Sequence, residues 1–331
     1  MTGLLESAQA GDESAFAQIV EQHRGELHAH CYRMLGSVQD AEDALQDALL
    51  RAWRALPRFE GRSSVRSWLY RIATNTCLDL AGRRPKRVLP LDHGPPSDAH
   101  DGPGPPLIET AWVEPYPDTA LTYEQREGVE LAFIAAVQHL PARQRAVLIL
   151  REVLGFSAAE VAESLDTTTA AVNSALQRAR AAVDERLPEQ SQQATLEALG
   201  DPRVKRIVAD YTDAWERGDV DAVAAMLAEE ATITMPPMAT WFQGEGVVTF
   251  LREWAFSGRA YDMEGRRRVR VVPTSANGQP AFGTYSWSDE HGVHRPTVLQ
   301  VLTFSGDKIT EITGFVTPEV FSRFGLPAEL P

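Results

Sequence analysis

Apolar side chains recur at steps of three and four residues around position 70, which predicts one amphipathic helix within residues 59–83. Its buried stripe consists of Val65, Trp68, Leu69, Ile72, Ala73, Thr76 and Leu80. The opposite face carries Arg66, Tyr70, Arg71, Asn75 and Arg83. Ser63 or Ser64 is expected to cap the start of the helix.

A second amphipathic helix is predicted over residues 40–53. Its apolar stripe consists of Ala41, Leu45, Ala48, Ala52 and Trp53. Ser37 and Asp40 predict an N-cap followed by an acidic first turn. Taken alone, the pattern is more typical of an ordinary core helix whose polar face lies in solvent.

Helical periodicity returns over residues 123–187, and its middle part predicts a helix-turn-helix. Ser157 and Glu160 have the spacing of a capping box that opens a short first helix. After a two-residue turn, Thr168 is placed to cap a second helix over residues 169–187. The apolar residues expected to join the two helices are Val161, Leu165, Val172 and Leu176.

The last third of the chain changes from helical to strand patterns. The predicted helices span residues 203–217, 219–228 and 247–254, and the predicted strands span residues 267–274, 281–288, 298–304 and 309–315. Asn277-Gly278 and Gly306-Asp307 have the composition of tight hairpin turns. This order predicts an α+β domain in which a curved antiparallel sheet wraps around helices.

Between the two helical regions lies a segment rich in proline, glycine and acids, residues 88–122. Such a composition favours an extended chain over a packed core, so the segment is predicted to be a linker.

Composition and charge narrow the function. The chain has 331 residues, enough for two or three domains, and a formal net charge of −14. The segment from Arg62 to Arg87 nevertheless contains seven basic residues and only one acidic residue. Such a local excess of positive charge is expected of a phosphate-binding surface. No apolar run is long enough to span a membrane, and the N-terminus lacks the pattern of a signal peptide, so we expect a cytoplasmic protein.

The residues of the first helix carry a family resemblance. The turn Phe59-x-Gly61-x-Ser63, followed by Trp68-Leu-Tyr-Arg-Ile-Ala-x-Asn75, resembles region 2 of bacterial extracytoplasmic-function sigma factors. Residues 40–53 resemble the helix with which these factors bind the clamp helices of RNA polymerase. Residues 140–148 and 172–180 resemble region 4, the reader of the −35 element. Asn173 and Ala175 stand where many relatives carry arginine, which leaves the preferred −35 sequence open.

The resemblance implies a role for each set of residues. Recognition and melting of the −10 element fall to Phe59, Arg62, Ser63, Arg66, Trp68, Arg71 and Asn75. Reading of the −35 element falls to Thr168, Asn173, Ser174, Gln177 and Arg178. Binding of core polymerase falls to Asp40, Asp43, Gln46, Asp47, Leu50 and Trp53. The implied domains are region 2 over residues 1–87, the linker over 88–122, region 4 over 123–190 and a C-terminal domain over 201–331.

The C-terminal domain resembles the SnoaL-like polyketide cyclase superfamily, whose cone-shaped fold often holds a pocket. The candidate pocket residues are Trp241, Trp254, Tyr285, Trp287 and His294. Aromatic residues at this spacing are more commonly core residues, and no acid-base pair is evident, since only His294 and distant acids such as Asp213 and Asp262 are candidates. No catalytic residue is therefore assigned.

A cluster of His23, His28, His30 and Cys31 invites a zinc assignment, but the side chains of a helix at these steps diverge. No metal and no cofactor is expected. Cys31 and Cys77 lie on predicted helices and are expected to be buried thiols.

The function predicted is that of a sigma factor that directs core RNA polymerase to promoters, through the β′ clamp helices and the β flap, with a C-terminal domain that modulates this activity. The alternatives are an autonomous helix-turn-helix regulator whose C-terminal domain senses a small ligand, and a SnoaL-like cyclase or isomerase fused to a DNA-binding module. The helix at residues 40–53 favours the first interpretation, because only a polymerase subunit needs it.

Overall fold

The computed structural model describes residues 2–118, 128–188, 190–257, 259 and 269–331. The chain forms two compact units, each assembled from two stretches of sequence. The first unit comprises residues 1–87 and 120–188, and the second comprises residues 88–119 and 189–331. The predicted start of helical periodicity near Tyr123 and the acid Asp262 lie outside the described residues.

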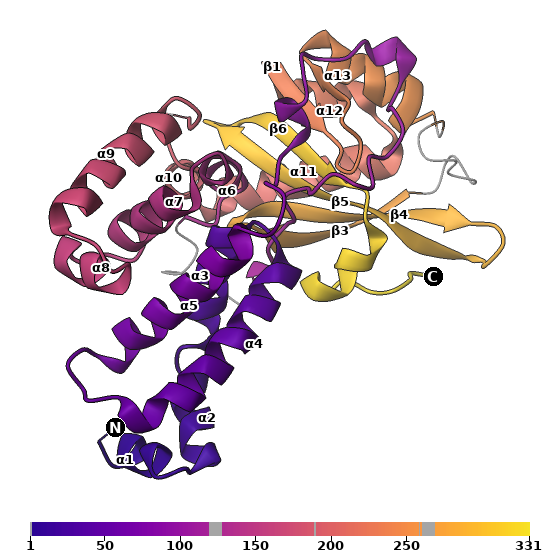
Figure 1. The fold of residues 1–331 in the computed structure, drawn as a ribbon. Coiled ribbons are helices and arrows are strands. Elements are labelled where there is room, and N and C mark those ends of the chain that lie inside the picture. Colours follow the sequence, from indigo (N-terminus) through magenta and orange to yellow (C-terminus); the bar gives the residue numbers. More distant parts are fainter. Residues whose placement is uncertain (1, 119–127, 189, 258, 260–268) are drawn as a thin grey trace. The chain divides into compact units, whose positions relative to one another are not determined.

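The first unit is helical (Figure 1). Its helices are α1 (Thr2–Gln9), α2 (Glu13–Glu21), α3 (Arg24–Leu35), α4 (Val38–Ala55), α5 (Val65–Ala81), α6 (Leu131–Gln138), α7 (Ala142–Leu148), α8 (Ala158–Ser164) and α9 (Thr169–Asp184). A short 3-10 turn, η1 (Leu56–Arg58), follows α4, and a π-helical stretch, η6 (Ile149–Val153), continues α7.

The helices of this unit begin where the side chains predict. Ser37 Oγ accepts a hydrogen bond from the backbone N–H of Asp40 at the start of α4, and Ser64 Oγ accepts one from Ser67 at the start of α5. Ser157 and Glu160 form the predicted capping box of α8. Thr168 caps α9, so the helix-turn-helix is confirmed.

Burial in α5 differs from the predicted stripe: Tyr70, Thr74 and Cys77 are buried as well, whereas Val65, Trp68, Ile72 and Leu80 are only half-buried. Tyr70, predicted to project from the polar face, is 1% exposed, and its hydroxyl donates a hydrogen bond to Glu26. Its ring lies against Phe156, a residue far away in sequence that supplies an additional packing surface. Tyr70 is therefore part of the core, with its ring in contact with both His30 of α3 and Phe156 of the second half of the unit.

The second unit contains the sheet. Its helices are α10 (Gln192–Leu199), α11 (Asp201–Arg217), α12 (Val220–Met226) and α13 (Glu245–Phe250), followed by the π-helical turn η7 (Leu251–Ala255). Its strands are β1 (Leu227–Thr234), β2 (Trp241–Gln243), β3 (Val269–Ala276), β4 (Gln279–Ser288), β5 (Val293–Ser305) and β6 (Lys308–Phe315). Gly218 ends α11 in the left-handed conformation, and Asp219 caps α12, both as predicted.

The sheet is mixed, which corrects the prediction of an antiparallel one. The six strands have the order β2-β1-β6-β5-β4-β3. The meander from β3 to β6 is antiparallel, with a left-handed Asn277-Gly278 pair at the first hairpin. β1 precedes the meander in the chain and pairs parallel with β6. Neither β1 nor its short partner β2 was predicted, because both lie between helices and their sequences have few features typical of strands.

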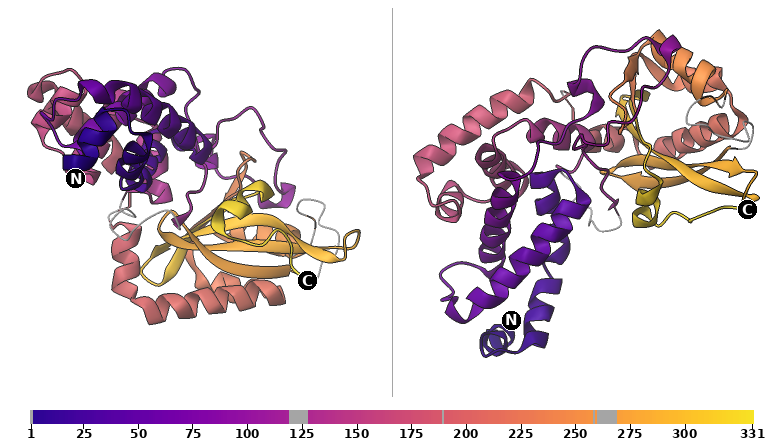
Figure 2. Two further views of the ribbon diagram at one scale, coloured as in Figure 1. Left: turned by 90° about the horizontal axis from the view of Figure 1, so that it is seen from below. Right: turned by 45° about the vertical axis from the view of Figure 1, so that its right-hand side comes forward.

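The two faces of the sheet are covered differently (Figure 2). On one face α11 packs along the sheet, with Tyr211 and Trp215 in a common core with Phe282. On the other face lies the C-terminal segment with the 3-10 helix η9 (Pro318–Phe324). An added Cβ at Gly283 would lie 2.7 Å from Leu326, so the close approach of this segment requires glycine there.

Residues 88–118 are packed on the second unit instead of forming an extended tether. They contain two short 3-10 turns, η2 (Pro90–Asp92) and η3 (Ala99–Asp101). Leu89, Ala99, Val113 and Tyr116 are buried. Composition predicted that this segment forms no core of its own, but it did not reveal that another domain supplies one.

Candidate nucleic-acid interface

The turn before α5 is built as an aromatic platform. The ring of Phe59 packs against that of Trp68, with centroids 4.9 Å apart. Gly61 adopts a φ of +70°, which glycine tolerates and which turns the chain into the cap at Ser64. Ser63 is half-buried beside this platform, and Arg62 is exposed and paired with Glu60. The structure thus brings together four of the predicted −10 residues, with Trp68 supporting Phe59.

Arg66 joins this surface to the core of the unit. Its Nε donates a hydrogen bond of 2.9 Å to Glu26, and its guanidinium carbon lies 4.8 Å from the centre of the Tyr70 ring. Burial opposes the charge of Arg66 most strongly, but the hydrogen bonds and electrostatic interactions with Glu26 and Tyr70 together outweigh it and raise the pKa of Arg66. Arg66 therefore stays charged, and it also contacts the ring of Phe156 at 5.3 Å.

Further along the same face, Arg71 and Asn75 meet the turn between α8 and α9. Arg71 Nη2 lies 3.2 Å from Asp166 Oδ1, and its Nη1 lies 3.9 Å from Glu163 Oε1. Asn75 Nδ2 donates a hydrogen bond of 3.3 Å to the backbone carbonyl of Ser164. Two of the predicted −10 residues are consequently engaged by the other half of the same unit, which the sequence did not predict.

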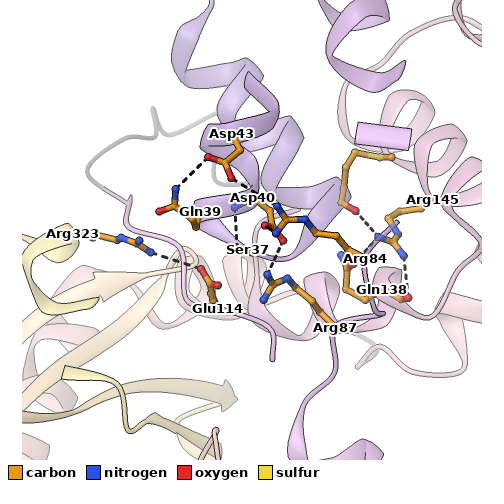
Figure 3. Close-up of polar contacts among 11 residues, drawn as sticks. Ser37, Gln39, Asp40, Asp43, Arg84, Arg87, Glu114, Gln138, Arg145 and Arg323 are labelled. Carbon is orange, nitrogen blue, oxygen red and sulfur yellow. Dashed lines mark hydrogen bonds and ion pairs between the residues drawn. The ribbon is translucent and has the colours of Figure 1, made fainter. Parts of the chain in front are cut away.

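The predicted polymerase-binding residues of α4 fall into two groups. Asp43, Gln46, Asp47 and Leu50 form one exposed stripe, in which Leu50 is 57% exposed. Asp40 is 3% exposed and is held between Arg84 and Arg87, the latter at 2.6 Å (Figure 3). Trp53 is half-buried against Phe16. Asp40 and Trp53 therefore support the helix, while the other four face outward.

The reading face of α9 is open. Thr168, Asn173, Ser174, Gln177 and Arg178 are all exposed. The side that packs on the rest of the unit is formed by Val172, Leu176, Ala179 and Val183, all buried. A helix that is buried along one side and polar along the other can enter the major groove of duplex DNA.

Arg145 is a residue that the sequence did not mark as special, although it is one of the most constrained in the unit. Its guanidinium donates hydrogen bonds to the carbonyl of Met34 on α3 and, within its own half, to Gln138 Oε1 and the carbonyl of Leu140 (Figure 3). Burial lowers its pKa to about 10. A buried guanidinium is costly unless its donors are satisfied, and here the two Nη groups are satisfied. The hydrogen bond to Met34 ties α7 to the end of α3.

The second unit contains a cavity of about 350 Å³ between the sheet and its helices. Its walls are mainly apolar, and the polar groups among them include Thr284, Ser286 and Gln300. Among the described lining residues the only carboxylate is that of Glu216, which accepts hydrogen bonds from the backbone N–H of Val271 and from Arg270. A carboxylate held in this way is poorly placed to serve as a free general base.

None of the five predicted pocket residues lines this cavity. Trp241 and Trp254 use their indole N–H groups to bind the carbonyls of Gly94 and Ala99 in the segment before region 4, both at 2.9 Å. Tyr285 donates a hydrogen bond to the carbonyl of Pro327, and His294 lies against the ring of Trp287 and the carbonyl of Pro331. Only Tyr285 and Trp287 lie on a predicted strand, and the carbonyls that Trp241, Trp254 and Tyr285 bind come from distant segments.

The histidine and cysteine cluster is structural. His30 is buried, with Nε2 at 2.8 Å from Thr74 Oγ1. Burial, followed by the charges of Arg33 and Arg66, lowers its pKa to about 3. His23 contacts Glu26, and His28 contacts Glu42. Among the residues that the structure describes, no group of three or more such side chains is placed to hold a metal ion. Cys31 and Cys77 are free and buried, as predicted.

In the parts of the chain that the structure describes, no helix combines the length and the apolar character needed to cross a lipid bilayer.

Three family models match the chain in succession. The model of Sigma-70 region 2 matches residues 19–87, that of Sigma-70 region 4 matches residues 130–183, and that of the SnoaL-like domain matches residues 208–312. The order is the one predicted from the sequence.

Relatives resemble the chain over most of its length. It is 41% identical over 323 residues to the ECF RNA polymerase sigma factor SigG of Mycobacterium tuberculosis, with 95% of this chain and 85% of the relative covered. It is 31% identical over 184 residues to the ECF RNA polymerase sigma-E factor of Escherichia coli, with 56% and 92% covered. The crystal structure of the extracytoplasmic-function sigma factor SigJ of Mycobacterium tuberculosis has the same fold, with a TM-score of 0.60, 22% identity, and 94% and 99% of the two chains covered.

Proposed function

Because the chain belongs to the extracytoplasmic-function sigma factors, we propose that its exposed residues divide the work of initiation as follows. Phe59, Ser63 and Asn75 bind an extruded base of the −10 element, while Arg62, Arg66 and Arg71 attract the backbone of the same strand. Thr168 and the exposed face of α9 read the −35 element. The protein acts in the cytoplasm, where core polymerase works.

The observation that carries this proposal is the construction of the turn before α5. The ring of Phe59 is supported from behind by Trp68, and the half-buried Ser63 lies in the same turn. Extruding a base costs a few kcal/mol, which such a pocket must return. The open face of α9 supplies the second contact that a promoter-reading protein requires.

Core polymerase is proposed to bind the exposed stripe of α4. Asp43, Gln46, Asp47 and Leu50 recur at helical spacing on the side that faces away from the core. An exposed leucine bordered by acids and an amide is suited to a protein partner with a basic, partly apolar surface. Asp40 is excluded from this contact because Arg84 and Arg87 occupy its carboxylate.

The C-terminal domain is proposed to modulate initiation by holding the linker. The described part of the linker, residues 88–118, is bound to this domain at several points. Ser97 donates to Trp241, Leu107 to Pro237 and Tyr116 to Asn277, and Glu114 pairs with Arg323 at 3.7 Å (Figure 3). The family resemblance implies that this segment threads the polymerase interior in the active complex. A linker held by the C-terminal domain is unavailable for that path, so the domain must release it or move with it.

The C-terminal domain is proposed not to be an enzyme, although relatives of its fold include cyclases and isomerases. The cavity has apolar walls and no free acid-base pair among its described residues. Binding of an uncharged ligand there is the alternative role, and it is compatible with regulation because a ligand that prefers one state of the domain would shift its hold on the linker.

The test of the −10 assignment is Asn75→Ala in the holoenzyme formed with cognate core polymerase, on a promoter selected with the wild-type holoenzyme. We expect normal assembly with core but weak permanganate reactivity of the melted strand. Gln22→Ala, which removes an exposed amide from the same domain, is the matched control. Permanganate footprints of wild-type intensity in Asn75→Ala would show that Asn75 does not hold the extruded base.

A further inference from the structure

The turn between α8 and α9 lies on the polar face of α5. Arg71 faces Asp166 and Glu163, and Asn75 binds the carbonyl of Ser164. Arg66, one turn earlier, contacts the ring of Phe156, which precedes α8. Three residues assigned to the −10 strand therefore have partners within the protein, all from one short stretch of region 4.

The chemistry of these partners matches that of a nucleic-acid strand. A carboxylate offers a guanidinium the same negatively charged acceptor oxygens as a phosphate does. A backbone carbonyl offers the amide of Asn75 an acceptor like those on base edges. The Phe156 ring beside Arg66 resembles a base placed against a guanidinium. Glu163, Ser164 and Asp166 thus present two anions and one acceptor to the residues that would receive DNA, and Phe156 lies beside them.

We propose that this turn acts as an internal substitute for the −10 strand in the free protein, so that single-stranded promoter DNA and the turn exclude each other on α5. The inference rests on the proposed assignment of Arg71 and Asn75 to the −10 element. Duplex DNA is treated differently, because the reading face of α9 remains exposed. The free chain consequently reads −35 duplex DNA while its strand-binding surface is occupied.

The ion pairs between α5 and the turn are weak enough for a DNA strand to displace the turn. The side chains of Arg71, Glu163 and Asp166 are 39%, 67% and 82% exposed, so their ion pairs are weakened by solvent. The buried network around Arg145 joins the two halves at a separate place, between α7 and the end of α3. Loosening the turn should therefore free the surface of α5 without unfolding the unit.

The backbone of the turn allows a mild test. Asp166 has a φ of +48°, a conformation that asparagine also adopts readily. Glu163→Gln combined with Asp166→Asn removes both charges and keeps the shape of the turn. Asp184→Asn combined with Glu185→Gln removes the same charge from exposed positions at the end of α9 and is the control.

The experiment measures anisotropy of the free full-length protein with a fluorescein-labelled single-stranded DNA 12-mer of randomised sequence, and with a duplex of the same length. We expect the turn variant to bind the single strand three- to tenfold more tightly than the control variant does, and the duplex within twofold. Adding Arg71→Ala to both variants should remove the difference, because the turn acts on that guanidinium.

Equal single-strand affinity in the turn and control variants would overturn the inference. A difference that persists with Arg71→Ala would overturn it as well, because the effect would then be one of general charge. The −10 assignment is judged separately by permanganate reactivity in the holoenzyme. If the turn and control variants bind the single strand equally while the Asn75→Ala holoenzyme melts the promoter poorly, the internal-substitute inference is refuted and the −10 assignment stands.

Discussion

Gly102 is the position at which a single methyl group should detach the linker from the C-terminal domain. Its φ is +74° and its ψ is −170°, a combination that is essentially restricted to glycine. A Cβ added there would lie 2.4 Å from Cζ2 of Trp254, whose indole is held in place by its hydrogen bond to Ala99. Gly102→Ala can therefore be accommodated only if the linker or the indole moves.

The size of the effect follows from two costs. The backbone strain amounts to about 1–3 kcal/mol, and forcing a methyl group into a packed contact costs about 1–3 kcal/mol. Their sum is at least about 2 kcal/mol, which raises the population of the detached linker roughly thirtyfold or more.

Hydrogen exchange of the full-length protein measures this population. The amides of Ser97, Gly104 and Leu107 donate to the C-terminal domain and should exchange at least roughly thirtyfold faster in Gly102→Ala, by the same 2 kcal/mol. Gly94→Ala is the matched control, because a Cβ there meets nothing within 4 Å. The amide of Tyr116 reports whether the far end of the linker is released too. Exchange in Gly102→Ala equal to that in Gly94→Ala would refute the reasoning.

Three further predictions concern the first unit. Leu50→Glu should weaken binding to core polymerase about tenfold in a pull-down titration, since it puts a charge on an exposed apolar contact. Asp40→Asn should instead lower the melting temperature of the protein. If Asp40→Asn weakened polymerase binding and Leu50→Glu lowered the melting temperature, the two assigned roles would be exchanged. Arg178→Ala should relax promoter preference at one position at a cost of about 1–3 kcal/mol in a promoter-library readout; a uniform loss with a shallower salt dependence would assign Arg178 to phosphate. His30 has a pKa of about 3 in the folded protein and 6.5 as its ordinary value, so only the unfolded chain binds its proton between these values. The contribution of His30 to the unfolding free energy should thus be complete above pH 6.5 and fall by about 1.4 kcal/mol per pH unit below it. In urea titrations His30→Gln should flatten this pH dependence. Equal slopes of unfolding free energy against pH in the wild type and the variant would contradict the assignment.

Local signals predicted most of the helical architecture, because helix caps and stripes are formed by residues close together in sequence. Ser37, Ser157 and Thr168 lie where the chain needs caps, and the structure uses each of them. The family resemblance was likewise confirmed because its motifs are contiguous.

Partners from distant segments could not be predicted in this way. Trp241 and Trp254 have the spacing of core aromatics, but what they bind is a linker that lies more than a hundred residues earlier. Arg71 and Asn75 were marked correctly as a polar surface, whereas nothing in their neighbourhood pointed to Ser164 or Asp166. The parallel pairing of β1 with β6 was not predicted for the same reason, since parallel partners cannot be joined by a hairpin and lie far apart in sequence.

The division of each unit into two stretches of sequence has a consequence for synthesis. Residues 88–119 leave the ribosome before region 4 does, yet their binding surface is made only when residues up to 331 have followed. At about 5–20 residues per second, roughly 7–30 seconds separate the completion of region 4 from that of the sheet. A nascent chain therefore passes through an interval in which regions 2 and 4 are complete and the linker is not yet bound, so polymerase that reaches the chain at that stage meets regions 2 and 4 without the completed C-terminal domain.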